Sequence, residues 1–376
     1  MKVVTAIDSF KGSMTSMEAG FAAAEGIHRV DADAEVQVRP LADGGEGTVE
    51  ALVAGMNGKT EHVKVTGPLG EPVICEYGII ESTKTAVIEM AGAAGITQVP
   101  DEKRNPLYTT TYGVGEVIKD AIEKGCRRFI VGIGGSATND GGVGMLQALG
   151  YAFLDKDGKQ VLPGARGLKD ITEITAAYVI PELAECKFRV ACDVTNPLCG
   201  ELGCSAIYGP QKGATPEMIQ DMDQWLGAYA ELAKERFPKA DPKYPGTGAA
   251  GGMGFAFLTF TDAVLESGTN IVLDETKLED YIKDADLVIT GEGRMDGQTA
   301  MGKAPVGVAK LAKKYGKKVI AFAGAVQRDA RACNDAGIDA FFPILRGVVT
   351  LDEAMKNENA KQNLADTAEQ VIRLMK

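Results

Sequence analysis

Three segments of this sequence each follow an apolar run and combine glycines with hydroxyl, acidic or basic side chains. The first, residues 132–144, holds six glycines in thirteen positions. Backbone N–H groups without neighbouring side chains, at the start of a helix, form a cradle for an anion. We therefore expect a phosphate or nucleotide site here; the alternative is a tight turn capped by an aspartate. The residues assigned to the site are Gly134, Gly135, Ser136, Thr138 and Asp140.

The second segment, residues 191–198, places Asp193 directly after an apolar run, and Asn196 precedes a proline shortly beyond it. A residue before proline is held in an extended or turn conformation. In a parallel α/β sheet the carboxyl ends of the strands face the active-site crevice. Asp193 can therefore serve there as a base or a metal ligand, and the alternative is an Asx turn.

The third segment, residues 289–303, runs from a buried strand through Gly291, Glu292 and Asp296 to Lys303, just before a predicted helix. Two carboxylates and a lysine in this position suit Mg²⁺ and phosphate. A solvated loop that caps a helix is the alternative.

Four shorter loops complete the set of candidates. Residues 8–12 and 43–48 follow two predicted strands at one sheet edge, where they would place Lys11 and several acids on one rim. Residues 209–213 contribute Lys212. Residues 246–254 hold five glycines and would suit a domain hinge as well as a ligand loop.

The elements around these loops alternate strand, loop and helix at both ends of the chain, which is typical of a parallel sheet with crossover helices. The middle of the chain begins with antiparallel strands in 63–90 and continues with strands near 129–133 and 189–192 and a long helix at 216–237. The sequence therefore predicts the α/β class. We expect a discontinuous, doubly wound, Rossmann-like domain from 1–66 and 266–376, with a second α/β domain inserted at 67–265 and the active site in the cleft between them.

At the ends of the chain, the predicted strands are 3–7, 36–41, 286–290, 319–323 and 340–344. The predicted helices there are 15–28, one that ends near 54, 304–315, 328–336 and 351–375.

The composition excludes several classes of protein. The chain is 45% hydrophobic and 24% charged, as in globular proteins. Its net charge of −12 argues against a nucleic-acid or anionic-membrane partner, since both need a basic face. Seven cysteines without a CxxC pair and only two histidines disfavour a disulfide framework or a zinc site. We see no signal peptide and no run of 18 apolar residues, so we expect a cytoplasmic protein.

With no histidine available as a general base, these loops favour chemistry that depends on positioning and charge. Phosphoryl transfer is a reaction of this kind. A P-loop and the protein-kinase motifs are both missing from the sequence. The residues alone therefore indicate an enzyme that handles a small phosphorylated molecule.

Six blocks of the sequence, in order along nearly the whole chain, resemble the bacterial type-1 glycerate kinases. They are DSFKG at 8–12, LADGGEGT at 41–48, GIGGSATNDGG at 132–142, CDVTNPL at 192–198, GPQKG at 209–213 and GEGRMD at 291–296. The resemblance implies a discontinuous Rossmann-like domain plus an inserted α/β domain. It also implies ATP-dependent phosphorylation of (R)-glycerate with Mg²⁺, most often at the 2-hydroxyl, to give 2-phosphoglycerate. Glycerate would be the small-molecule substrate of a monomer or homodimer.

The roles that follow from this resemblance are hypotheses. Asp193 would orient or deprotonate the glycerate hydroxyl, and Lys11 and Lys212 would neutralise phosphate or the glycerate carboxylate. Glu292 and Asp296 would hold Mg²⁺. The residues expected to bind substrate are Ser9, Phe10, Asp43, Glu46 and Asn196. The residues expected to bind nucleotide or phosphate are the five of the first loop together with Gly291 and Lys303.

Other functions stay open on the sequence. A glycerate 3-kinase would make 3-phosphoglycerate. A loose match to the dinucleotide fingerprint, Gly132-x-Gly134-x-x-Ala137 with Asp155 further on, would suit a nicotinamide-dependent hydroxy-acid oxidoreductase, although Asp155 has the sequence context of a hairpin turn. A non-catalytic metabolite sensor on the same scaffold is the third alternative.

Overall fold

The computed structural model describes residues 1–45 and 47–376, so Glu46 falls outside the described residues. The chain divides into two compact units: residues 1–57 together with 269–376 form the first unit, and residues 58–268 form the second. The sequence predicted these boundaries at 66/67 and 265/266. The first boundary differs because β3 (Lys59–Thr66) pairs with β4 (Pro72–Ile80), a strand of the second unit.

The first unit is built around a sheet of five parallel strands in the order β2–β1–β11–β12–β13. Their bounds are β1 Lys2–Ile7, β2 Glu35–Pro40, β11 Leu287–Met295, β12 Lys318–Val326 and β13 Ala340–Pro343. Counted along the chain within this unit, the order is 2-1-3-4-5, which is one of the doubly wound arrangements. The order reverses between β1 and β11, and such sheets bind ligands outside the carboxyl ends of the strands at that point. The predicted α/β class is confirmed.

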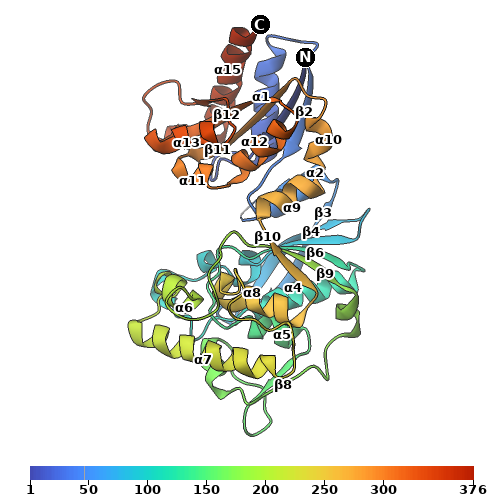
Figure 1. The fold of residues 1–376 in the computed structure, drawn as a ribbon, viewed down its shortest axis with the longest axis vertical. Coiled ribbons are helices and arrows are strands. Elements are labelled where there is room, and N and C mark those ends of the chain that lie inside the picture. The colour runs from blue at the N-terminus through green and yellow to red at the C-terminus, as the bar shows by residue number, and fades with distance from the viewer. Residues whose placement is uncertain (46) are drawn as a thin grey trace. The chain divides into compact units, whose positions relative to one another are not determined.

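Helices cover both faces of this sheet because the buried side chains of β1 alternate between the faces. Val3 and Ile7 pack in one apolar cluster with α1 and α15, which lie side by side (Figure 1). Val4 and Ala6 pack in the other cluster with α10 and α12. The helices of this unit are α1 Ser16–His28, α2 Thr48–Gly55, α9 Gly268–Glu275 (which starts at the unit boundary), α10 Leu278–Ile282, α11 Gly297–Ala300, α12 Ala304–Lys314, α13 Ala332–Asp335, α14 Leu351–Met355 and α15 Asn357–Met375.

Local chemistry sets the ends of these helices. Thr15 caps α1 in a capping box, in which its side chain accepts from the Glu18 N–H and the Glu18 side chain accepts from the Thr15 N–H. The helix predicted at 351–375 is two helices in the structure, interrupted at Lys356. The Asn357 amide nitrogen donates to the Ser13 carbonyl at 2.9 Å, which ties the start of α15 to the loop after β1.

The second unit contains a six-stranded sheet in the order β10–β9–β6–β5–β4–β3. Strands β5, β6, β9 and β10 are parallel, and β3–β4 and β4–β5 are antiparallel, as the turn-rich sequence of 63–90 predicts. The remaining strand bounds are β5 Thr85–Glu89, β6 Arg128–Gly132, β7 Ala152–Leu154, β8 Glu173–Thr175, β9 Lys187–Ala191 and β10 Ala263–Glu266, of which β7 and β8 form a separate pair.

One large apolar core fills the second unit, and α4 and α8 pack into it against the sheet. Thr215 caps α7, and Pro216 stands at the first turn, where a missing N–H costs nothing. The helices are α3 Ala91–Ala94, α4 Tyr112–Glu123, α5 Val143–Ala148, α6 Cys204–Tyr208, α7 Pro216–Lys234 and α8 Ala249–Phe260. Short 3₁₀ helices span Ile96–Gln98, Asp101–Lys103, Ala165–Asp170, Pro181–Glu185, Pro210–Lys212 and, in the first unit, Arg328–Arg331. None of the described helices has the length and apolar character that crossing a membrane requires.

Candidate functional site

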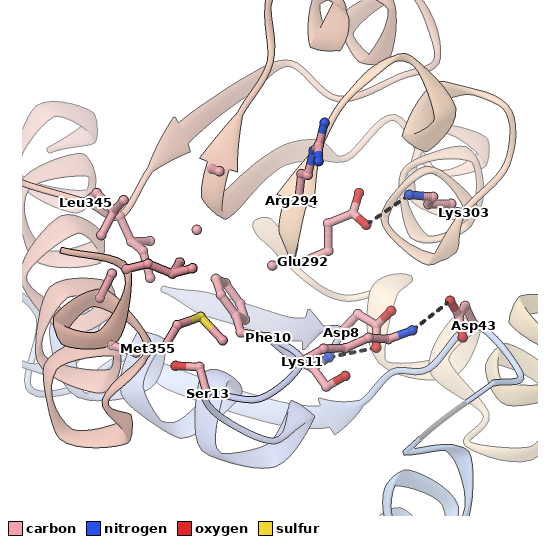
Figure 2. Close-up of a pocket in the computed structure, with 18 residues that line it drawn as sticks. Asp8, Phe10, Lys11, Ser13, Asp43, Glu292, Arg294, Lys303, Leu345 and Met355 are labelled. Atoms are coloured by element: carbon pink, nitrogen blue, oxygen red, sulfur yellow. Dashed lines mark hydrogen bonds and ion pairs between the residues drawn. The ribbon is translucent and has the colours of Figure 1, made fainter. Parts of the chain in front are cut away.

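A cavity of about 390 Å³ lies at the carboxyl ends of the strands of the first unit, where the strand order reverses (Figure 2). The residues that line it come from the loops after β1 and β2, from β11 and β12, from the residue before α12, and from the chain that follows β13 into α15. Six of the predicted site residues meet there: Ser9, Phe10, Lys11, Asp43, Glu292 and Lys303. The fold thus brings together residues that lie up to 294 positions apart, counted from Ser9 to Lys303.

The loop after β1 is held in place by backbone hydrogen bonds. The Asp8 N–H donates to the Gly291 carbonyl at 2.9 Å, which continues the pairing of β1 with β11 by one residue. Phe10 and Met14 exchange two backbone hydrogen bonds, at 2.9 and 3.1 Å, and close a tight loop. Gly12, at its tip, has φ +75°. Only a residue without Cβ adopts this conformation at low cost, so the glycine allows the chain to turn and present Lys11.

Charges at this cavity are crowded and only loosely paired. The Lys11 ammonium lies 4.0 Å from the Asp43 carboxylate, and the Lys303 ammonium lies 3.9 Å from Glu292. Both distances exceed those of a hydrogen bond. Burial, with the nearby Asp43 charge as a second cause, raises the pKa of Asp8 to about 7. Burial also raises the pKa of Glu292. The site therefore concentrates carboxylates that a cation would stabilise.

Asp8 gives the first testable prediction. Its folded-state pKa of about 7 lies above its ordinary value of 3.8, so between about pH 4 and 7 the folded protein binds more protons than the unfolded chain. The free energy of unfolding therefore falls as pH rises through this window. Asp8→Asn removes the charge, and we expect its Tm at pH 8 to exceed that of the wild type by about 2–8 °C.

Thermal melts of both proteins from pH 4 to 8, in buffer without divalent cations, check this. The gain should largely disappear near pH 4, because Asp8 is protonated in the folded state there and the pH is close to its ordinary pKa of 3.8. The control is Asp335→Asn, at an exposed aspartate of the same unit, which should show no such pH-dependent gain. An Asp8→Asn gain that is equal at pH 4 and pH 8 would contradict the assignment of the effect to the Asp8 charge.

The segment predicted as a glycine loop at 291–303 is in part a strand. β11 continues to Met295 and pairs with β12 as far as Val326. A Cβ on Gly291 would lie 2.1 Å from the Phe322 carbonyl oxygen, so this glycine serves the close approach of two strands. This close approach explains the glycine without a phosphate, and phosphate binding at Gly291 stays a prediction.

The two predicted metal ligands are neighbours that differ in their surroundings, and the Lys303 ammonium lies 3.9 Å from each of Glu292 and Asp296. Asp296 Oδ1 accepts hydrogen bonds from the N–H groups of Gln298 and Thr299, at 2.9 and 3.3 Å, and so caps α11. It is not among the residues that line the cavity, whereas Glu292 is. The Thr299 hydroxyl donates to Glu292 Oε1 at 2.5 Å and fixes this carboxylate. Asp296 thus caps a helix as the alternative expected, and its role as a metal ligand stays a prediction.

In the second unit, Lys212 is buried beneath the loop that follows β6. Its ammonium donates to Ser136 Oγ at 2.8 Å and to the Thr138 carbonyl at 2.6 Å, and the residue is 2% exposed. Burial lowers the pKa of Lys212 to about 8. These two hydrogen bonds fix the loop after β6 to the Lys212 ammonium, whose positive charge lies directly beneath the loop. Gly134 and Gly135 remain exposed above this charge.

The last part of the same loop does not reach solvent. Thr138 and Asp140 are 0% and 1% exposed. Asp140 accepts from the N–H and hydroxyl of Thr111, at 2.8 and 2.9 Å, and from the Gly142 N–H at 3.1 Å. Asp140 thus holds the loop together internally, whereas the buried Thr138 hydroxyl has no hydrogen-bond partner among the described residues. Their predicted contact with phosphate stays a prediction, which this burial does not favour. The exposed part of the predicted cradle is limited to Gly134 and Gly135, next to Ser136.

Asp193 and Asn196 follow β9, the neighbour of β6 in the sheet. Asp193 is exposed, and the Gly268 N–H donates to its Oδ1 at 3.3 Å. The Asn196 side chain is used within its own loop: it donates to the Leu202 carbonyl at 2.8 Å and accepts from the Tyr208 hydroxyl at 2.7 Å. Asn196 thus has a structural role that keeps the strand-end loop in shape.

The glycine-rich segment 246–254 packs inside the second unit. Ala250, Gly251 and Gly252 all have positive φ, and the Gly141 N–H donates to the Gly251 carbonyl at 2.9 Å. A Cβ on Gly252 would lie 2.7 Å from the Gly141 Cα. These glycines allow two loops of one unit to come into contact. The sequence suggested a domain hinge or a ligand loop instead.

Comparison with known proteins places this architecture in a family. The sequence matches the model of the glycerate kinase family over residues 3–376. The chain belongs to the glycerate kinase family. A glycerate kinase from Haemophilus influenzae is 50% identical over 375 residues, with 100% of this chain and 99% of the relative covered. The glycerate 2-kinase of Escherichia coli K12 is 48% identical, with 98% of each chain covered.

A solved crystal structure supports the same family assignment. The crystal structure of a Salmonella typhimurium LT2 protein assigned as glycerate kinase 2 superposes with a TM-score of 0.93 at 46% sequence identity, covering 100% of this chain and 98% of that one. The protein is therefore a kinase, and the oxidoreductase alternative is set aside. Asp155 indeed forms a turn: its Oδ1 accepts from the N–H groups of Asp157 and Lys159, at 2.9 and 3.0 Å.

The carboxylates of this glycerate kinase family member fit Mg²⁺ in part. Asp8, Asp43 and Glu292 offer the hard oxygen donors that Mg²⁺ prefers. In the part of the chain that the structure describes, no three His, Cys, Asp or Glu side chains are arranged to hold a metal. Such a donor set suits an ion that takes one or two carboxylates and completes its shell with phosphates and water.

Sequence reasoning missed the C-terminal wall of the cavity and Arg294, which also lines it. The wall is formed by Ile344, Leu345, Leu351, Ala354, Met355 and Ala360. A signal was present in the sequence: residues 344–355 place several apolar side chains in a segment that belongs mostly to neither a buried strand nor an amphipathic helix. Glu46, predicted to bind substrate, lies outside the described residues.

Proposed function

We propose that this protein transfers the γ-phosphoryl group of ATP to the 2-hydroxyl of (R)-glycerate and releases ADP and 2-phosphoglycerate. The observation that carries the proposal is the family membership over residues 3–376, and the 2-position follows the name of the Escherichia coli relative. In this reaction a bond forms between the glycerate O2 atom and the γ-phosphorus, and the bond from that phosphorus to the β–γ bridging oxygen breaks. The hydroxyl proton passes to a base.

Asp193 is our candidate for that base. It is an exposed carboxylate directly beyond the carboxyl end of β9, where a parallel sheet presents its catalytic groups. The Gly268 N–H that donates to one of its oxygens orients the carboxylate. Neither histidine of the chain lies in any of the candidate loops, so a carboxylate is the available proton acceptor.

The cationic groups would stabilise the anionic substrates. Lys11 and Lys303 stand at the cavity of the first unit, loosely paired with Asp43 and Glu292, and suit the phosphates of the nucleotide. Lys212, with Ser136 and the exposed residues Gly134 and Gly135, suits a phosphate or the glycerate carboxylate. Asp8 and Glu292 would hold Mg²⁺, which supplies charge neutralisation on the phosphates when bound.

The test is a ³¹P NMR spectrum of the purified protein incubated with ATP, Mg²⁺ and (R)-glycerate. We expect the signals of ADP and 2-phosphoglycerate to appear together. A 3-phosphoglycerate signal would replace the proposed regiochemistry with that of a 3-kinase. ATP that stays unchanged with folded protein would overturn the proposal and favour the metabolite sensor. A reaction without glycerate is the control for simple ATP hydrolysis, which would yield ADP and inorganic phosphate.

A further inference from the structure

The cavity of the first unit has two chemically different ends (Figure 2). At the charged end, Lys11 approaches Asp43, and Lys303 approaches Glu292. At the apolar end, Leu345 and Met355 lie on the same side as Phe10. A ligand that fills both ends must itself have an ionic part and an apolar part.

The apolar end is built by a short piece of chain that crosses between β13 and α15. The Ile344 N–H donates to the Ala323 carbonyl at 2.8 Å, which fixes the start of this piece to the sheet. Thr350 caps α14, whose helix carries Leu351, Ala354 and Met355 to the cavity. A Cβ on Gly12 would lie 3.2 Å from the Met355 Cε, so this methyl group rests on the loop that presents Lys11. The wall is therefore held at both of its ends.

Several of these apolar side chains are incompletely covered by protein. Leu351 is 75% exposed and Leu345 is 39% exposed, although both line a concave site. Exposed apolar side chains gathered at a cavity mark a surface that a ligand covers. Glycerate has three carbons, two hydroxyls and a carboxylate, so it offers no apolar face for this wall. The cavity of about 390 Å³ is also in the range of cofactor-sized ligands, about 300–1,000 Å³.

We propose that the apolar end binds the base of the nucleoside triphosphate, with the phosphates extending toward Lys11 and Lys303. A purine is a flat, largely apolar ring system joined to a polyanion, which matches the two ends of the cavity. Ser13 also lines the cavity, and its buried hydroxyl has no hydrogen-bond partner in the part of the chain that the structure describes. The assignment rests on the proposed function for the identity of the nucleotide.

This inference changes two expectations from the sequence. Phe10 moves from the glycerate-binding set to the base-binding set, because its ring belongs to the apolar end. Ser9 and Asp43 stand near the phosphates instead of near glycerate. The groups left for glycerate are then those of the second unit, with Asp193 and Lys212 foremost among them.

The test uses Leu351→Asp and Met355→Ala in the full chain, with binding measured by calorimetry. We expect the Kd for ADP and for adenosine to rise at least tenfold, because the base loses its apolar contact. The Kd for inorganic tripolyphosphate should stay within twofold. The matched control is Leu374→Asp, at a leucine on α15 that is 81% exposed and does not line the cavity; all three affinities should match the wild type.

The outcomes separate this inference from the proposed function. Unchanged ADP and adenosine affinities in both variants overturn the inference, even if the wild type phosphorylates glycerate. Loss of tripolyphosphate affinity equal to the loss for ADP also overturns it, because the wall would then act on the phosphates. If the variants lose ADP selectively and the wild type transfers no phosphate to glycerate, the base site stands and the proposed function fails.

Discussion

Replacing Asp193 with asparagine is expected to lower kcat by about 10²–10⁴-fold, because asparagine has the same size but cannot accept the glycerate hydroxyl proton. The substitution should leave the fold intact. Asp193 is exposed at the end of β9, and the Gly268 N–H can donate to an amide oxygen as it does to the carboxylate oxygen. We expect the Tm to change by less than about 1 °C, since a surface substitution of this kind has a small effect on stability.

Steady-state kinetics with varied glycerate and ATP measures the effect of Asp193→Asn. A base lost from the transition state lowers kcat while both KM values change little. The control is Asp221→Asn on α7, an exposed aspartate outside all of the candidate loops, which should keep the wild-type rate. An Asp193→Asn rate within threefold of the wild type would remove Asp193 from the mechanism. A large rise in the KM for glycerate at constant kcat would make it a binding residue only.

Lys212→Met is expected to lower kcat/KM by about 10²–10³-fold with little loss of stability. Methionine nearly matches the length of lysine but brings no charge to the loop after β6, so the anion would lose a preorganised positive group. Two opposing effects act on stability. The Thr138 carbonyl loses a donor, which costs about 1–3 kcal/mol. The folded state no longer buries a charge, and the lowered pKa of Lys212 shows that this burial is unfavourable.

The pH dependence offers a second readout for Lys212. Since its pKa lies near 8, the ammonium is the main form at pH 7 and is lost as pH rises through 8. The kcat/KM of the wild type should therefore fall on the basic side of pH 8, and the Lys212→Met profile should lack that fall. Lys119→Met, at an exposed lysine of α4, is the control and should keep the wild-type profile. A Tm that drops by more than 10 °C together with activity would instead assign Lys212 a purely structural role.

Much of the fold follows from patterns visible in the sequence. β1 is a short apolar run that leads into Asp8, and β1, β2, β12 and β13 lie within a few residues of their predicted positions. The first boundary between the two units was harder to predict from the sequence. The strand Lys59–Thr66 alternates exposed and half-buried positions, a pattern that fits an edge of either sheet, and only its partner β4 decides which one it joins.

The candidate site shows where sequence reasoning reaches its limit. Residues directly after strands, such as Lys11 and Asp43, were found because the carboxyl edge of a parallel sheet collects them. Glycines were harder to interpret, because a glycine can either expose its N–H group to an anion or allow two backbone segments to come close together. Gly291 and Gly252 belong to the second kind, which becomes visible only once the Phe322 carbonyl and the Gly141 backbone are placed against them.

The discontinuous layout of the first unit sets the order in which the protein can fold on the ribosome. β1 lies between β2 and β11 in the sheet, and the whole second unit separates β1 from β11 along the chain. At about 5–20 residues per second, translation of residues 58–268 takes about 10–40 s. During that time the edge of β1 that will pair with β11 presents unpaired backbone N–H and C=O groups, which are open to pairing with other nascent chains. The second unit can fold first, and the cavity with its lysines forms only after the C-terminal helices have been synthesised.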